Sequence, residues 1–137
     1  MKVEYREGTN LDVKKLDVLW KSIGWRPRGS AKWKEVLSKS YFMLTAWDGD
    51  NLVGTGRIME DGVMCMFYDI GVHPSYQRHG IGSAIIQALI KKVKNKGYVS
   101  IGLFAWEGNE ANMPFYEKFG FVRKSSGMEL DEHMRPE

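Results

Sequence analysis

The stretch Gln77-Arg78-His79-Gly80-Ile81-Gly82 decides how this chain folds, because it joins a strand-like segment to a helix-like one. An apolar run ends at Val72, and helical periodicity begins near Gly80. The first backbone N–H groups of a helix have no acceptor within the helix, so they can face an anion. Glycine at positions 80 and 82 leaves room for a phosphate, and Arg78 adds a positive charge. The stretch therefore predicts a phosphate-binding turn, although an ordinary structural turn can also contain such glycines.

Downstream of the turn, the spacing of apolar residues predicts a helix with one apolar face. That face consists of Ile81, Ala84, Ile85, Ala88, Leu89 and Val93. Lysines gather towards the end of this helix and Gly97 stops it. Residues 98–104 are predicted as a strand, and a helical crossover favours its parallel pairing with the strand that ends at Val72. A short helix over 110–119 and a last strand over 121–130 complete the pattern.

Upstream of the turn, the pattern predicts a first strand around Val3 and Tyr5, followed by two helices. The apolar residues of these helices are Leu11, Leu16, Leu19 and Trp20 in the first and Trp33, Val36 and Leu37 in the second. Three antiparallel strands in series follow, over residues 41–47, 52–59 and 63–72. Neither a repeat nor a linker interrupts the chain, so we expect a single domain over residues 1–137.

Composition narrows the classes of function. The chain has 137 residues and is 43% hydrophobic, which suits one globular core. Its net charge of +3 comes from scattered residues, so we expect no nucleic-acid partner. Cys65 is the only cysteine, so we expect neither an intrachain disulfide nor a metal site, and a cytoplasmic location fits. The sequence has no export-like or membrane-length apolar segment, so we expect no membrane partner.

The residues of the turn resemble the signature of the GNAT superfamily of N-acetyltransferases, which is Gln/Arg-x-x-Gly-x-Gly/Ala after a central strand. The preceding Ile70-Gly71-Val72-His73-Pro74 is similar to that family's strand end. The run from Asn109 to Phe121 is similar to its Asn-x-x-Ala-x-x-x-Tyr-x-x-x-Gly-Phe segment, with Asn112 where alanine is usual. The resemblance covers almost the full chain. It implies an α/β (α+β) fold with a mixed, mostly antiparallel sheet of about six to seven strands, helices on both faces and a splayed central parallel strand pair.

The same resemblance implies which residues hold acetyl-CoA. The pyrophosphate would bind the backbone after the signature glutamine, at Arg78, His79, Gly80, Ile81, Gly82 and Ser83. The pantetheine arm would pair with the backbone at Ile70 and Val72, and Asn109 keeps the position expected to touch CoA. Acetyl-CoA is thus the expected co-substrate, and no metal is expected.

Tyr116 falls where the family often has a phenol near the acetyl sulfur. A phenol with a pKa of roughly 10 can protonate a departing thiolate, so we expect Tyr116 to be the general acid. The alternative is that Tyr116 packs beside Phe115 and Phe119 in an aromatic core.

An acceptor amine must lose a proton before it attacks, so a carboxylate or a chain of waters is needed as the base. Candidate acids are Glu60, Asp61, Asp69 and Glu107. Asp69 interrupts an apolar strand and is either functional, as the base, or placed on an exposed face. Glu60 and Asp61 fit simple turn residues. His73 and His79 lie in the turn itself, where a protonated ring would assist anion binding rather than catalysis.

These features predict an N-acetyltransferase that moves an acetyl group from acetyl-CoA to a primary amine of a small molecule, or to a peptide amine. We expect direct attack in a ternary complex, because Cys65 has no nucleophile signature around it. Asp69 and Glu107 suggest a cationic acceptor, and the exposed last strand suggests a homodimer. The alternative is a module that binds acetyl-CoA without transferring the acetyl group.

Overall fold

The computed structural model describes residues 1–105, 110–124 and 127–135, within two compact units, Met1–Leu103 and Phe104–Glu137. The first unit contains β1 (Glu4–Glu7), α1 (Val13–Ile23), α2 (Ser30–Lys39), β2 (Phe42–Asp48), β3 (Asn51–Glu60), β4 (Met64–Val72), the 3-10 turn η1 (Pro74–Tyr76), α3 (Ile81–Val93) and β5 (Ser100–Leu103). The second unit contains η2 (Glu110–Asn112), α4 (Met113–Glu117) and η3 (Glu132–Met134). That all of these elements form a single domain over 1–137 stays a prediction.

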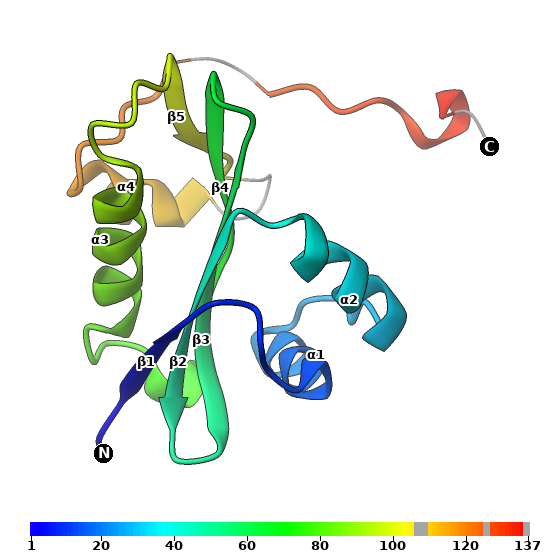
Figure 1. Cartoon of the computed structure of the whole chain (residues 1–137), viewed down its shortest axis with the longest axis vertical. Helices are drawn as coiled ribbons and strands as arrows, with labels where there is room; N and C mark the ends of the chain where they lie inside the picture. Colours follow the sequence, from blue (N-terminus) through cyan, green and yellow to red (C-terminus); the bar gives the residue numbers. More distant parts are fainter. Residues whose placement is uncertain (106–109, 125–126, 136–137) are drawn as a thin grey trace. The chain divides into compact units, whose positions relative to one another are not determined.

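The strands of the first unit form a five-stranded sheet in the order β1-β2-β3-β4-β5. The pairs from β1 to β4 are antiparallel, and β4 pairs with β5 in parallel. Helix α3 lies on one face of the sheet, and α1 and α2 lie on the other (Figure 1). The predicted fold class, a mixed and mostly antiparallel sheet with helices on both faces, is therefore confirmed.

The number of strands is lower than the six to seven that we expected, because the last strand predicted over 121–130 is not formed in its described residues. Residues 121–124 and 127–130 have no strand conformation. A strand is stable only through its ladder to a neighbour, and alternating side chains do not supply one. Gly127 and the charged Arg123 and Lys124 also weaken the alternation that suggested a strand.

The face of the sheet under α1 and α2 holds a cluster of buried side chains. Its members are Leu16, Leu19, Trp20, Trp33, Leu37, Met43, Trp47 and Leu52. Helical spacing directs Leu16, Leu19 and Trp20 of α1 inward, as the apolar pattern predicted. Within the described part of the chain, no helix has the length and apolar character that crossing a membrane would require.

On the opposite face, α3 approaches β3 closely because β3 carries glycines under it. A Cβ added at Gly56 would lie 2.5 Å from Cγ2 of Ile85 and 3.0 Å from Cδ1 of Leu89. A Cβ at Gly54 would lie 3.0 Å from Cδ1 of Ile85. The two glycines therefore set the distance between the sheet and the helix whose first turn follows the predicted phosphate turn.

We expect Gly56→Ala to lower the free energy of unfolding by about 1–3 kcal/mol, because the added methyl overlaps a branched side chain in a packed core. The corresponding fall in Tm is about 4–12 °C, measurable by thermal unfolding. Gly102→Ala is the matched control, since a Cβ there meets the flexible Met66 side chain at 3.3 Å. Equal Tm values for the two variants would contradict the close approach.

Candidate functional site

The predicted phosphate turn links the end of β4 to the first turn of α3. Gly80 precedes the helix with φ of 80°, and among the described residues no side chain caps the helix by a hydrogen bond. The Ala84 N–H donates to the Gly80 carbonyl at 3.0 Å, so the N–H groups of residues 81–83 precede the first helical hydrogen bond. Arg78 also has a left-handed backbone, with φ of 66°. The turn thus presents free donors and the positive end of a helix to an anion.

Several hydrogen bonds hold this turn in place. The Tyr76 hydroxyl donates to Oδ2 of Asp48 at 2.6 Å, which ties η1 to the end of β2. This bond to the carboxylate raises the pKa of Tyr76. The Ser75 N–H donates to Nδ1 of His73 at 3.0 Å. His73 therefore helps to form the turn, and its predicted assistance to anion binding stays a prediction.

Within the part of the first unit that the structure describes, no strand pairs with one edge of β4 where it approaches the turn. Strand β5 pairs only with residues 64–67 of β4, although β4 continues to Val72. The parallel pairing that we expected between these two strands is therefore present. The His73 N–H donates to the Val53 carbonyl at 2.8 Å, and the alternation of an antiparallel ladder then turns the N–H and C=O of Val72 away from β3. The Val72 carbonyl accepts a hydrogen bond from the Gln77 side chain at 3.2 Å.

The open segment of β4 begins with a β-bulge. Thr55 pairs with Gly71 and Arg57 with Tyr68, so two residues of β4 oppose the single residue Gly56 of β3. Asp69 is one of the two and has φ of 56°, a left-handed conformation that is uncommon outside glycine. The bulge bends β4 where the strand leaves β5 and begins its approach to the turn.

The Asp69 side chain points into a cluster of arginines and not to solvent. It is 9% exposed, so the interpretation that it lies on an exposed face is wrong. Nη1 and Nη2 of Arg28 donate to Oδ2 and Oδ1 of Asp69, each at 2.8 Å. Nε of Arg57 donates to Oδ2 at 2.8 Å. Although burial raises the pKa of Asp69, hydrogen bonds and charge from Arg28 and Arg57 outweigh it and the pKa is lowered.

This pairing changes the interpretation of Asp69 as a candidate base. A carboxylate with a lowered pKa and both oxygens bound by guanidinium groups has little tendency to take a proton. Its charge is also balanced locally, so it gives no support to a cationic acceptor. Sequence analysis missed Arg28 and Arg57 entirely. The sequence did contain one signal for such partners. Asp69 is an acid within an apolar strand, and a buried carboxylate requires a partner of opposite charge.

The lowered pKa of Asp69 makes a prediction about acid stability. Its contribution to stability is complete above the unfolded pKa of about 3.9 and is lost as the pH falls through the lower folded pKa. We expect the wild-type protein to lose stability steeply below about pH 4 and Asp69→Asn, which has no proton to take up there, to show a shallower loss. Urea unfolding from pH 7 to 2.5 measures both curves. Parallel curves would mean that Asp69 is not ionised in the folded state.

The other candidate bases are turn residues or lie outside the described residues. Oε2 of Glu60 accepts from the Gly62 N–H at 2.6 Å. Oδ1 of Asp61 accepts from the N–H groups of Val63 and Met64 at 2.9 and 2.8 Å, and these bonds lower the pKa of Asp61. Both acids therefore form the β3–β4 turn, in agreement with the simpler interpretation. Glu107 lies outside the described residues.

Tyr116 belongs to α4 in the second unit and lies in a group of aromatic rings. Its ring centroid is 5.2 Å from that of Phe115 and 6.2 Å from that of Phe121. The side chain is half-buried, and burial raises the pKa of its hydroxyl. The phenol therefore keeps its proton at neutral pH, as a general acid must. Asn109 lies outside the described residues, and Asn112 is exposed at the end of η2.

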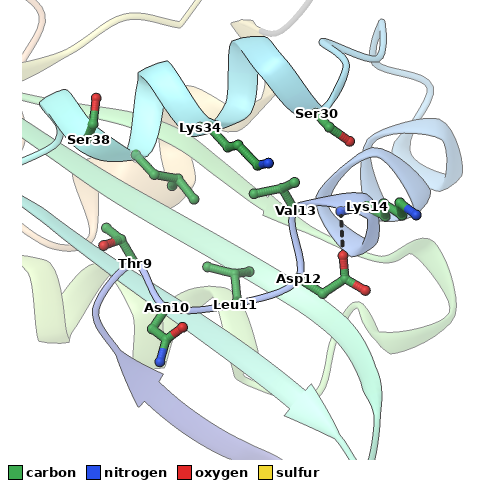
Figure 2. Close-up of a pocket in the computed structure, with 10 residues that line it drawn as sticks. Thr9, Asn10, Leu11, Asp12, Val13, Lys14, Ser30, Lys34 and Ser38 are labelled. Carbon is green, nitrogen blue, oxygen red and sulfur yellow. Dashed lines mark hydrogen bonds between the residues drawn. The ribbon is translucent and has the colours of Figure 1, made fainter.

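A separate hollow of about 510 Å³ lies between α2 and the segment that leads into α1 (Figure 2). It is lined by Thr9, Asn10, Leu11, Asp12, Val13, Lys14, Ser30, Lys34, Leu37 and Ser38. Leu37 is the one buried member, and the Asp12 carboxylate already caps α1 through the Lys14 N–H at 3.0 Å. Of the residues predicted to bind the cofactor or to take part in catalysis, none that the structure describes lines this hollow. In the described part of the chain, no three potential metal ligands come together.

Comparison with known proteins agrees with this geometry. The model of the acetyltransferase (GNAT) family matches residues 11–121. The "Uncharacterized N-acetyltransferase ycf52-like" of Prochlorococcus marinus is 30% identical over 122 residues, which are 85% of this chain and 66% of that protein. The chloroplastic GCN5-related N-acetyltransferase 1 of Arabidopsis thaliana is 30% identical over 127 residues, which are 89% of this chain and 61% of that protein. The chain thus spans slightly less than two thirds of each of these relatives.

Among solved structures, the Staphylococcus aureus protein SA2161, described as a "Probable Acetyltransferase", superposes with a TM-score of 0.84 at 28% identity. The superposition covers 95% of this chain and 99% of that one.

Proposed function

The chain belongs to the acetyltransferase (GNAT) family, and on that basis we propose that it transfers an acetyl group from acetyl-CoA to a primary amine of a small molecule or a peptide. The observation that carries this proposal is the uncapped N-terminus of α3 beside the open edge of β4. The helix end suits a pyrophosphate because it offers unpaired N–H groups and a positive dipole. The strand edge suits the amides of a pantetheine arm, which can add to it like a further strand.

The donor would be held mainly by backbone groups. Residues 78–83 would bind the pyrophosphate, as the family signature implies, with the Arg78 side chain adding a charge-assisted contact. The backbone at Ile70 and Val72 would pair with the pantetheine arm, whose thioester would then reach the gap between β4 and β5. The ligand would displace the Gln77 side-chain amide from the Val72 carbonyl, since their 3.2 Å hydrogen bond lies at an exposed site.

In the proposed reaction, the neutral amine attacks the thioester carbonyl, and the carbon–sulfur bond breaks. The departing sulfur takes a proton from the Tyr116 hydroxyl, and the amine gives up its own proton to water or to a chain of waters. We do not assign the base to Asp69, because its carboxylate is bound by Arg28 and Arg57. Most of the rate enhancement would come from aligning donor and acceptor.

Direct transfer is favoured over an acyl-enzyme. Cys65 is the one cysteine of the chain and its side chain is fully buried. Burial and the charge of Glu60 raise the pKa of its thiol to about 11. Because the thiolate is the nucleophilic form, this cysteine is unreactive at neutral pH.

Two measurements test the proposal. Calorimetric titration of acetyl-CoA into the protein reports binding, and release of free thiol from acetyl-CoA reports transfer. The acceptor panel would contain polyamines, aryl-alkylamines, amino acids, aminoglycosides and lysine peptides. Binding with acceptor-dependent thiol release supports the enzyme, whereas binding without release from any acceptor supports the alternative, a module that only binds acetyl-CoA. Absence of binding would refute both.

A further inference from the structure

Both carboxylate oxygens and the backbone carbonyl of Asp69 are held by hydrogen bonds. Both carboxylate oxygens are bound by arginines, at 2.8 Å in each contact. Its backbone carbonyl accepts from the Thr55 hydroxyl at 2.7 Å, and Thr55 is fully buried. A bulge leaves a backbone group without its partner in the ladder. Here that group is the Asp69 carbonyl, and the Thr55 hydroxyl of β3 supplies the hydrogen bond instead. The left-handed conformation of Asp69 is thus fixed from both β3 and Arg28.

Arg28 is itself held firmly in the loop between α1 and α2. Its guanidinium lies 4.5 Å from the Trp33 ring centre and 5.4 Å from the Trp20 ring centre. Asp17 of α1 accepts from the backbone N–H of Arg28 at 2.9 Å and from that of Gly29 at 2.8 Å. The same carboxylate accepts from Nε1 of Trp33 at 2.7 Å. Loop, helices and guanidinium therefore form one connected set of contacts.

The loop also touches the open segment of β4 directly. A Cβ added at Gly71 would lie 2.7 Å from Cη2 of Trp25 and 2.9 Å from Cδ1 of Ile23. Trp25 packs edge-on against Trp20, with ring centroids 5.0 Å apart. Backbone that lies so close to an indole ring has little freedom to shift. The α1–α2 loop thus supports the same residues, 70–72, whose backbone would receive the pantetheine arm.

We infer that Arg28, Arg57 and Thr55 are positioning residues for acetyl-CoA, and that they act by fixing Asp69 in the bulge that presents residues 70–72 to the pantetheine arm. This inference rests on the proposed function. None of these side chains needs to touch the ligand. They act through the backbone of β4, and Arg28 links that backbone to the helices on the face of the sheet opposite α3.

The inference is tested with Asp69→Asn and Thr55→Val. The first variant keeps the size of the side chain and removes the charge, whereas the second keeps all charges and removes the hydroxyl that holds the bulge. We expect each folded variant to bind acetyl-CoA about tenfold or more weakly, which corresponds to about 1.4 kcal/mol. Amide hydrogen exchange at residues 70–72 should be faster than in the wild type. Glu35→Gln is the matched control, because it neutralises an exposed carboxylate on α2.

Kinetics separate positioning from a loss of folded protein. A partly unfolded sample loses kcat in proportion to the unfolded fraction and keeps its KM, whereas a displaced bulge raises the KM for acetyl-CoA. We expect KM to rise about tenfold with kcat nearly unchanged. The rise in KM for acetyl-CoA in Arg28→Lys should be more than half of the rise in Arg28→Gln. Lysine keeps the positive charge, but its ammonium cannot make the bidentate contact of a guanidinium.

The outcomes distinguish this inference from the proposed function. If the wild-type protein does not bind acetyl-CoA, the proposed function fails. If the wild type binds, and folded Asp69→Asn and Thr55→Val bind with unchanged affinity and show unchanged exchange at residues 70–72, only the positioning role is overturned. Weaker binding in these variants but not in Glu35→Gln supports it.

Discussion

Replacing Gly82 with aspartate is expected to abolish acetyl-CoA binding without destabilising the fold. Gly82 lies in the first turn of α3, where no side chain caps the helix. A carboxylate there is favoured by the helix dipole by about 0.3–1 kcal/mol, and aspartate also has a higher helix propensity than glycine. The same charge repels a pyrophosphate. We therefore expect Tm to be equal or higher and Kd for acetyl-CoA to rise at least about 100-fold, or roughly 2.7 kcal/mol.

The control for this variant is Gln87→Glu, which adds the same charge to the exposed middle of α3. It should leave Kd within about twofold of the wild type, since charge on that surface is screened. Calorimetric titration measures Kd, and thermal unfolding measures Tm. Gly82→Asp protein that is stable and still binds acetyl-CoA normally would show that the anion is held elsewhere.

The second large effect is expected from Tyr116→Phe, which removes the proposed proton donor and keeps the ring. Packing against Phe115 and Phe121 is preserved, so Tm should change little. Without the phenol, the departing sulfur must take its proton from water, and we expect kcat to fall about 100-fold. The Kd for acetyl-CoA should remain within about threefold, because the family signature places the binding contacts in the turn.

The control here is Tyr5→Phe, which removes a phenol from the outermost strand of the sheet. The pH profile gives a further readout. Burial raises the pKa of Tyr116 above its ordinary value of 10.0, so any fall in kcat from loss of this proton should occur at a higher pH than for an unburied phenol. An undiminished kcat in Tyr116→Phe would mean that the phenol is only part of the aromatic group.

The turn could be predicted from sequence because its signals are local. The strand that ends at Val72, the glycine at 80 and the apolar stripe from Ile81 lie within one stretch, and each depends on short-range backbone preferences. Glycines 54 and 56 were not predicted to matter. Their role depends on α3 packing against them, and only the tertiary structure brings these elements together.

Asp69 shows why alternation fails at a bulge. The argument for an exposed face assumed that successive side chains point to opposite sides, but the left-handed backbone at Asp69 breaks that order. Its partners Arg28 and Arg57 are 41 and 12 residues away, a distance over which single-sequence patterns carry no information. The prediction of a last strand over 121–130 was wrong for a related reason. A strand needs a paired neighbour, and the local sequence does not show whether one is present. The roles of Tyr116 and of the turn residues stay predictions, as does that of Asn109.

The proposed binding of acetyl-CoA at the uncapped start of α3 would also affect how long the protein survives in a cell. A ligand that binds only the folded chain adds to its stability, by about 2.7 kcal/mol at 100 times its Kd. Acetyl-CoA at the helix start would be such a ligand. Proteases that cleave transiently opened chains respond to the population of open molecules, which falls by about the same factor of 100. The lifetime of this protein would therefore follow the supply of its own substrate.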